Sequence, residues 1–104
     1  MKRAKRFKVP KSHYLVLDAN LIQLNFPDGD LFQSEEFSVK LTTEVLRLKP
    51  SLLVAHAPND YHVDHRAVSS ASLVAASFRV PVLWVDPMMG NDFLPNYYVD
   101  ISQF

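Results

Sequence analysis

The sequence predicts an α/β fold in which an open, mostly parallel sheet carries helices packed on it. Short apolar runs of strand length alternate with segments whose apolar residues recur at helical spacing, an order typical of β-α-β units. A composition of 48% hydrophobic and 21% charged residues is close to that of an average globular domain. Together these observations predict one small α/β domain.

The first third of the chain contains two apolar segments and a turn. Tyr14–Leu17 is a short apolar run that fits a helix or a strand. Ile22, Leu24 and Phe26 alternate with polar residues, which predicts a strand. Residues 27–30, Pro-Asp-Gly-Asp, have the composition of a turn, in which proline presets φ and glycine accepts a positive φ.

A helix is predicted to follow this turn. Ser34 is a suitable amino-terminal cap, and two glutamates come directly after it. Pro50 ends the helix because a residue before proline disfavours helical backbone. One apolar face is predicted at helical spacing, made of Phe37, Leu41, Val45 and Leu48.

The second half of the chain predicts strand, helix and strands in turn. Residues Ser51–Ala55 are predicted as a strand. Its last four residues, Leu52–Ala55, are all apolar, which is typical of a parallel strand buried on both faces. Pro81–Val85 is a second buried-type strand, and Tyr97–Ile101 is predicted as a last one. The helix between the first two has a predicted apolar stripe of Ala67, Ala71, Val74, Ala75 and Phe78. In a parallel sheet, the loops after Ala55 and Val85 would lie at one edge.

Charge divides the chain into a basic segment, 1–12, and the α/β domain, 13–104. Six of the eleven basic residues lie in the first eleven positions, although the net charge is zero. No nucleic-acid-binding motif accompanies them, so a solvated terminus explains them best and no nucleic-acid partner is expected. The chain has no cysteine, and no apolar run is long enough to span a membrane. We expect a cytoplasmic location; the sequence leaves the oligomeric state open.

Residues 59–68 contain the highest density of candidate functional side chains in the sequence. Asp60, His62, Asp64 and His65 fall within six residues, between a predicted strand and a predicted helix. Imidazole and carboxylate are ligands of zinc, and a carboxylate near a helix start can cap the helix or orient a histidine. Ordinary loop polarity explains the same residues, so spacing alone leaves a metal site and a plain loop both open.

Three stretches carry a resemblance to a known family. Residues 49–68, Lys-Pro-Ser-Leu-Leu-Val-Ala-His-Ala-Pro-Asn-Asp-Tyr-His-Val-Asp-His-Arg-Ala-Val, resemble the second signature block of the PIG-L/LmbE-like zinc-dependent de-N-acetylases. Residues 24–31 and 95–102 resemble two flanking segments, in the family's order and at about its spacing. The resemblance implies a Rossmann-like sheet.

The resemblance also implies roles for the matching residues. His65 would ligate zinc, His62 would act as an acid or stabilise the oxyanion, and Asp64 would support this histidine pair. The implied reaction is hydrolysis of an N-acetyl amide on an amino-sugar conjugate of the N-acetylglucosamine type, with zinc polarising the carbonyl. Asp60 and Arg66 are further candidates for substrate contact, although loop polarity or an ion pair explains them equally well.

The chain departs from the family at its first signature, Ala-His-Pro-Asp-Asp-Glu. That motif would supply a zinc histidine, a zinc aspartate and the general base, and this sequence does not contain it. We therefore expect a fragment or a degenerate relative of the enzyme, inactive by itself. A fragment should show a raw sheet edge or an uncovered apolar face where the first strand belongs. The alternative is a non-catalytic α/β binding or interaction module that lacks a complete metal site.

Overall fold

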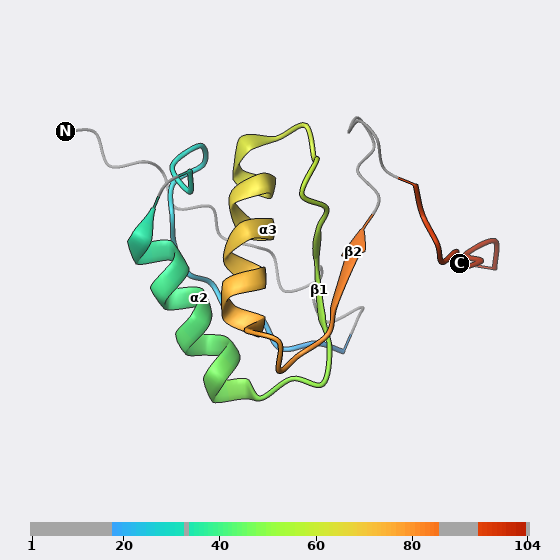
Figure 1. Cartoon of the computed structure of the whole chain (residues 1–104), viewed down its shortest axis with the longest axis horizontal. Helices are drawn as coiled ribbons and strands as arrows, with labels where there is room; N and C mark the ends of the chain where they lie inside the picture. Colours follow the sequence, from blue (N-terminus) through green and yellow to red (C-terminus); the bar gives the residue numbers. More distant parts are fainter. Residues whose placement is uncertain (1–17, 33, 86–93, 104) are drawn as a thin grey trace.

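The computed structural model describes residues 18–32, 34–85 and 94–103, and it confirms the α/β class. The described elements are helix α2 (Glu35–Leu48), strand β1 (Leu53–His56), helix α3 (Val63–Ala76) and strand β2 (Val82–Val85), as Figure 1 shows. The predicted helix after Ser34 and the two apolar strands are all present. The predicted run Tyr14–Leu17 lies outside the described residues.

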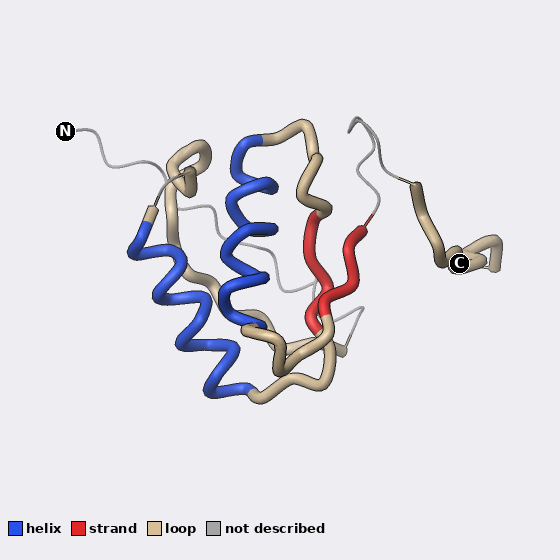
Figure 2. The backbone as a smooth tube through the Cα atoms, viewed as in Figure 1, coloured by secondary structure: helices blue, strands red, loops and turns tan. Residues whose placement is uncertain are grey.

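The two strands pair in parallel, as the β-α-β order predicts. Their register runs from Leu53 opposite Val82 to His56 opposite Val85, and α3 makes the crossover between them. Figure 2 shows α3 lying between the strands and α2, so that α2 packs on α3 rather than on the sheet. The loop after β1 and the amino end of α3 therefore meet at the carboxyl edge of the sheet.

Local signals at both ends define α2. The Ser34 hydroxyl accepts a hydrogen bond from the backbone N–H of Phe37 at 3.1 Å, as predicted for the cap. At the other end Lys49 takes a left-handed conformation, with φ of 49°, and its N–H donates to the Val45 carbonyl. Pro50 then prevents the helix from continuing.

Helix α3 begins at Val63, earlier than the apolar stripe from Ala67 indicates. His62 is its amino-terminal cap, with φ of −91° and ψ of 131°, and the His62 Nδ1 accepts the N–H of Asp64 at 3.0 Å. Sequence rules favour serine, threonine, aspartate or asparagine at this position, so they do not identify a histidine cap. The earlier start puts Asp64 and His65 in the first helical turn.

Small side chains of α3 form much of the core. Ala71, Ala75 and Ala76 are buried, which lets the helix approach its neighbours closely. For two residues of the predicted apolar stripe, the prediction of burial is wrong. Val74 is 62% exposed and lines an open cavity beside α2, and Phe78 is fully exposed beyond the end of the helix, in a left-handed conformation with φ of 61°.

One face of the sheet is open to solvent in the described part of the chain. Val54 is 60% exposed, and Leu83 and Val85 are also exposed on alternate strand positions. The prediction of strands buried on both faces is therefore wrong, because the described helices cover a single face. An exposed apolar face is what a fragment should show, and that the chain is a fragment stays a prediction.

Two predicted strands are absent. Residues 22–26 form no strand, because Asn25 has a left-handed backbone with φ of 62° that interrupts the extended run. Phe26 instead packs edge-on against Phe37, with ring centroids 5.4 Å apart. Residues 97–101 pair with no described strand, and their large side chains are exposed.

Replacing either of two serines by alanine should have different effects on the stability of the fold. Ser34→Ala removes a helix cap and should lower the free energy of unfolding by about 1 kcal/mol. The Ser69 hydroxyl is fully buried and has no hydrogen-bond partner among the described residues. Ser69→Ala removes an unpaired polar group and should leave stability unchanged or raise it by about 1 kcal/mol. Urea unfolding followed by circular dichroism measures both, and equal losses would contradict the assignment.

Candidate active site

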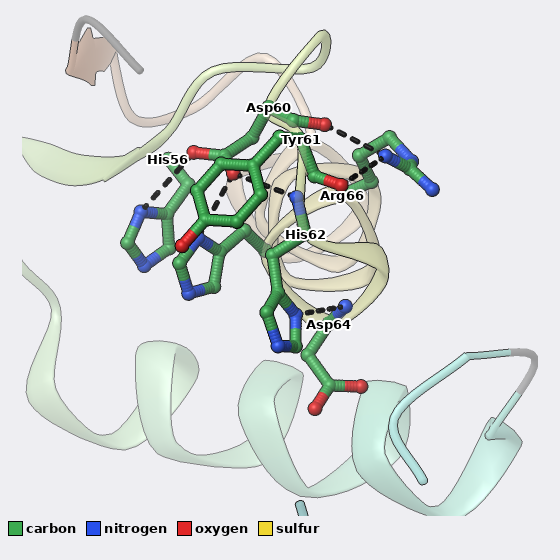
Figure 3. Close-up of polar contacts among 7 residues, drawn as sticks. His56, Asp60, Tyr61, His62, Asp64 and Arg66 are labelled. Atoms are coloured by element: carbon green, nitrogen blue, oxygen red, sulfur yellow. Dashed lines mark hydrogen bonds and ion pairs between the residues drawn. The ribbon is translucent and has the colours of Figure 1, made fainter. Parts of the chain in front are cut away.

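The loop that joins β1 to α3 folds back on itself at the carboxyl edge of the sheet. The Asp60 N–H donates to the Ala57 carbonyl at 3.2 Å, and Ala57 is completely buried. The loop then leads directly into the His62 cap. Figure 3 shows the side chains of this loop gathered at the amino end of α3. Backbone turn and helix cap together fix where the histidine rings lie.

Asp60 is the central polar group of the loop. Its side chain is buried, and its Oδ1 accepts the N–H of His62 at 3.0 Å and lies 3.0 Å from the Nδ1 of His65. Its Oδ2 faces the Nδ1 of His56 at 3.9 Å. Burial by itself raises the pKa of this carboxyl, but the hydrogen bonds from His62 and His65 outweigh it and hold the pKa below its ordinary value.

Three imidazole rings stack beside this carboxylate. His65 lies between the other two, 3.8 Å from His56 with a 4° angle between the planes, and 4.7 Å from His62 with a 23° angle. The Tyr61 ring meets His62 and His65 edge-on, at 6.0 Å from each. Burial, and then the proximity of His65, lowers the pKa of His56, so that its neutral form is favoured.

Asp64 connects the site to a distant turn. It is buried, and its two carboxylate oxygens accept the N–H groups of Gly29 at 2.6 Å and Leu31 at 3.3 Å. The turn at residues 27–30 is present as predicted, closed by a bond from the Asp30 N–H to the Pro27 carbonyl. The resemblance assigns Asp64 to supporting the histidines, and the structure places it on backbone amides. Among the described carboxylates, the one that is hydrogen-bonded to a histidine ring is Asp60.

Arg66 braces the loop from outside. Its Nη1 donates to the carbonyls of Asp60 at 2.8 Å and Tyr61 at 3.0 Å. In Figure 3 the guanidinium lies on the opposite side of the loop from His56. Arg66 also lines an open cavity of about 420 Å³ between α2 and α3, whose wall is mostly apolar. Substrate contact by Arg66 or by Asp60 stays a prediction, and both side chains already hold the loop.

Among the residues that the structure describes, two groups of three side chains bring metal-ligating atoms within 4.8 Å of one another: His56, Asp60 and His65, and Asp28, His62 and Asp64. The lone pair of an imidazole nitrogen lies in the plane of its ring, so the nearly parallel rings of His56 and His65 do not converge on one ion. In the second group, the Nδ1 of His62 and both oxygens of Asp64 already accept backbone N–H groups, which leaves the Nε2 of His62 and the exposed carboxylate of Asp28. The described residues therefore do not complete a tetrahedral zinc cage in this arrangement.

The comparisons with known proteins identify the family. The sequence profile of the GlcNAc-PI de-N-acetylase (PIG-L) family matches residues 4–76, which is more than two thirds of the chain. No curated protein and no solved structure matches the chain significantly. The protein belongs to the PIG-L family, and the function of this family is de-N-acetylation. No described helix is long and apolar enough to cross a membrane.

Asp64→Asn should loosen the turn that Asp64 holds. Asparagine keeps one acceptor oxygen but turns an NH₂ group toward the second backbone N–H, so a buried donor faces another donor. We expect a loss of about 1–3 kcal/mol in the free energy of unfolding. The amide of Gly29 should also exchange faster with solvent deuterium. Asp30→Asn changes the same charge at an exposed position and is the matched control; equal effects would contradict the tether.

Stability should fall in two stages as the pH is lowered in the presence of a chelator. The pKa of His56 is lower in the folded chain than its ordinary 6.5, so the unfolded chain takes up this proton first and stability falls below that pH. The pKa of Asp60 is also lowered, so its contribution is present above about 3.8 and is lost below it. His56→Gln should flatten the upper stage alone. Urea unfolding across this pH range would contradict us if the slope were unchanged in the variant.

Proposed function

We propose that the chain carries the histidine half of a metal-dependent de-N-acetylase centre that acts on amino-sugar conjugates of the N-acetylglucosamine type. One observation carries this proposal: the rings of His62 and His65 lie 4.7 Å apart at the amino end of α3, and a buried carboxylate holds His65. The family match supports the reaction class. The carboxyl edge of a parallel sheet is where open α/β proteins bind ligands.

The histidines fit the chemistry of amide hydrolysis. Attack on the carbonyl places negative charge on its oxygen, and the departing nitrogen then needs a proton. The Nδ1 of His62 is bound to the helix, so its Nε2 is the nitrogen left for substrate. His65 would be one ligand of a divalent cation, and the resemblance implies that this cation is zinc. Because the described residues do not complete the cage, we assign no step to the ion.

The same incomplete cage favours a second candidate, a non-catalytic module that keeps the fold and binds a sugar or a protein. Metal binding separates the two. A catalytic half-site should bind a transition metal weakly through His65 alone, whereas a pure binding module should show no dependence on this residue. The identity of the sugar, zinc as the metal and a cytoplasmic location stay predictions.

The purified chain provides the first test. We expect no release of free amine from an N-acetylglucosamine conjugate, and weak zinc binding by calorimetry that His65→Ala abolishes. His62→Ala should leave this binding unchanged and is the matched control, because it removes a neighbouring imidazole of the same helix turn. Turnover by the chain alone with stoichiometric zinc would contradict the proposed half-site, and loss of zinc in His62→Ala would reverse the two roles.

A version joined to a segment bearing the family's first signature provides the second test. There His65→Ala should abolish tight zinc binding. His62→Ala should lower kcat by about 10²–10⁴-fold, the usual contribution of an acid catalyst, and leave the metal in place. If the joined protein bound zinc tightly and still released no amine, the non-catalytic module would be favoured.

A further inference from the structure

We propose that the loop holds His62 and His65 in opposite neutral tautomers, and that Asp60 is the positioning residue that sets the tautomer of His65. The use of this arrangement in catalysis rests on the proposed function, whereas the tautomers themselves can be measured without it. The proposal follows from three hydrogen bonds of the loop and from which atoms can donate them.

The tautomer of His62 follows from its cap. The backbone N–H of Asp64 points at the His62 Nδ1 from 3.0 Å. A backbone N–H can only donate, so Nδ1 must offer its lone pair. In a neutral imidazole the single proton then sits on Nε2. His62 therefore presents an N–H donor away from the helix.

The tautomer of His65 follows from Asp60. The His65 Nδ1 lies 3.0 Å from the Asp60 Oδ1, and an ionised carboxylate can only accept. Nδ1 must therefore carry the proton, which leaves a lone pair on Nε2. Histidines that ligate metals are usually held in this way, with the second ring nitrogen donating to a carboxylate.

The carboxylate is well placed to impose this choice. Asp60 is only 4% exposed, and the N–H of His62 holds the same Oδ1 at 3.0 Å. His56 does not compete, because its Nδ1 lies 3.9 Å from the other oxygen, beyond hydrogen-bond distance. The acceptor that faces His65 is therefore fixed by the fold and not by the ring itself.

Two neighbouring rings thus differ in hydrogen bonding at their free nitrogens. The rings lie 4.7 Å apart with a 23° angle between their planes, yet the free nitrogen of one donates and that of the other accepts. A donor suits a carbonyl oxygen that gains negative charge, and a lone pair suits a cation. In this role Asp60 acts on the reaction through His65, which makes it a positioning residue.

The test measures the tautomers by long-range ¹H–¹⁵N correlation on the ¹⁵N-histidine-labelled chain, above pH 7 with a chelator. We expect the proton on Nε2 in His62 and on Nδ1 in His65. Asp60→Ala should move His65 toward the Nε2–H form that a free imidazole favours, while His62 keeps its tautomer. His56→Gln is the matched control, because it removes the other ring beside His65 and leaves the Asp60 bond intact.

Asp60→Asn serves if the alanine variant fails to fold, since its amide oxygen still accepts the N–H of His62. A neutral acceptor is weaker than a carboxylate, so the Nε2–H population of His65 should rise above that of the unaltered chain. In chain that binds zinc, Asp60→Ala should weaken binding by about 10–100-fold and Asp60→Asn by less. These graded effects distinguish positioning from general support of the fold.

Two results would overturn the proposal: His65 protonated mainly on Nε2 in the unaltered chain, or an unchanged His65 tautomer in a folded Asp60 variant. Failure of the proposed function looks different. If both tautomers are as expected but no zinc binds, the half-site is refuted and the assignment of the protons stands.

Discussion

A buried carboxylate, that of Asp60, is the interaction on which the site depends. Burying a charge costs free energy unless hydrogen bonds compensate it, and Asp60 obtains them from the His62 N–H and the His65 ring. The same bonds turn the chain from β1 into α3. If the loop rearranged, the buried carboxylate would lose these hydrogen bonds. This cost keeps the histidine rings in place.

The family's second signature combines structural and chemical roles in one short segment. Asp64 ties the helix to the turn at Gly29, and Arg66 braces the loop carbonyls, while His62 serves both as helix cap and as the candidate acid. A substitution at such positions changes stability and chemistry together. Activity measurements on this segment therefore need a folding control, and residues with one role alone are the better comparisons.

The sequence predicted the helices and the parallel pair well, because Ser34, Pro50 and the apolar periodicity are local signals. It failed where tertiary contacts decide. Asn25 breaks the alternating run, and no local rule indicates that Phe26 packs on Phe37 instead. In the site, spacing left Asp64 open as a cap or as a partner of a histidine, and only the family resemblance assigned it to the histidine pair; the structure adds Asp60 beside the His65 ring. The usable signal for Asp60 was its place two residues before His62, the spacing of a side-chain-to-backbone turn.

Helix α3 packs against its neighbours through alanines, so there is little free space around the helix below the site. The buried apolar positions of α3 are Ala71, Ala75 and Ala76, and an alanine has no rotamer that can shift to absorb added volume. Even one extra methyl group there would have to be accommodated by displacing the helix backbone. The histidine rings at the first turn of the helix would move with the backbone. The orientation of these rings therefore depends on alanines about two to three turns away, which contact no ligand.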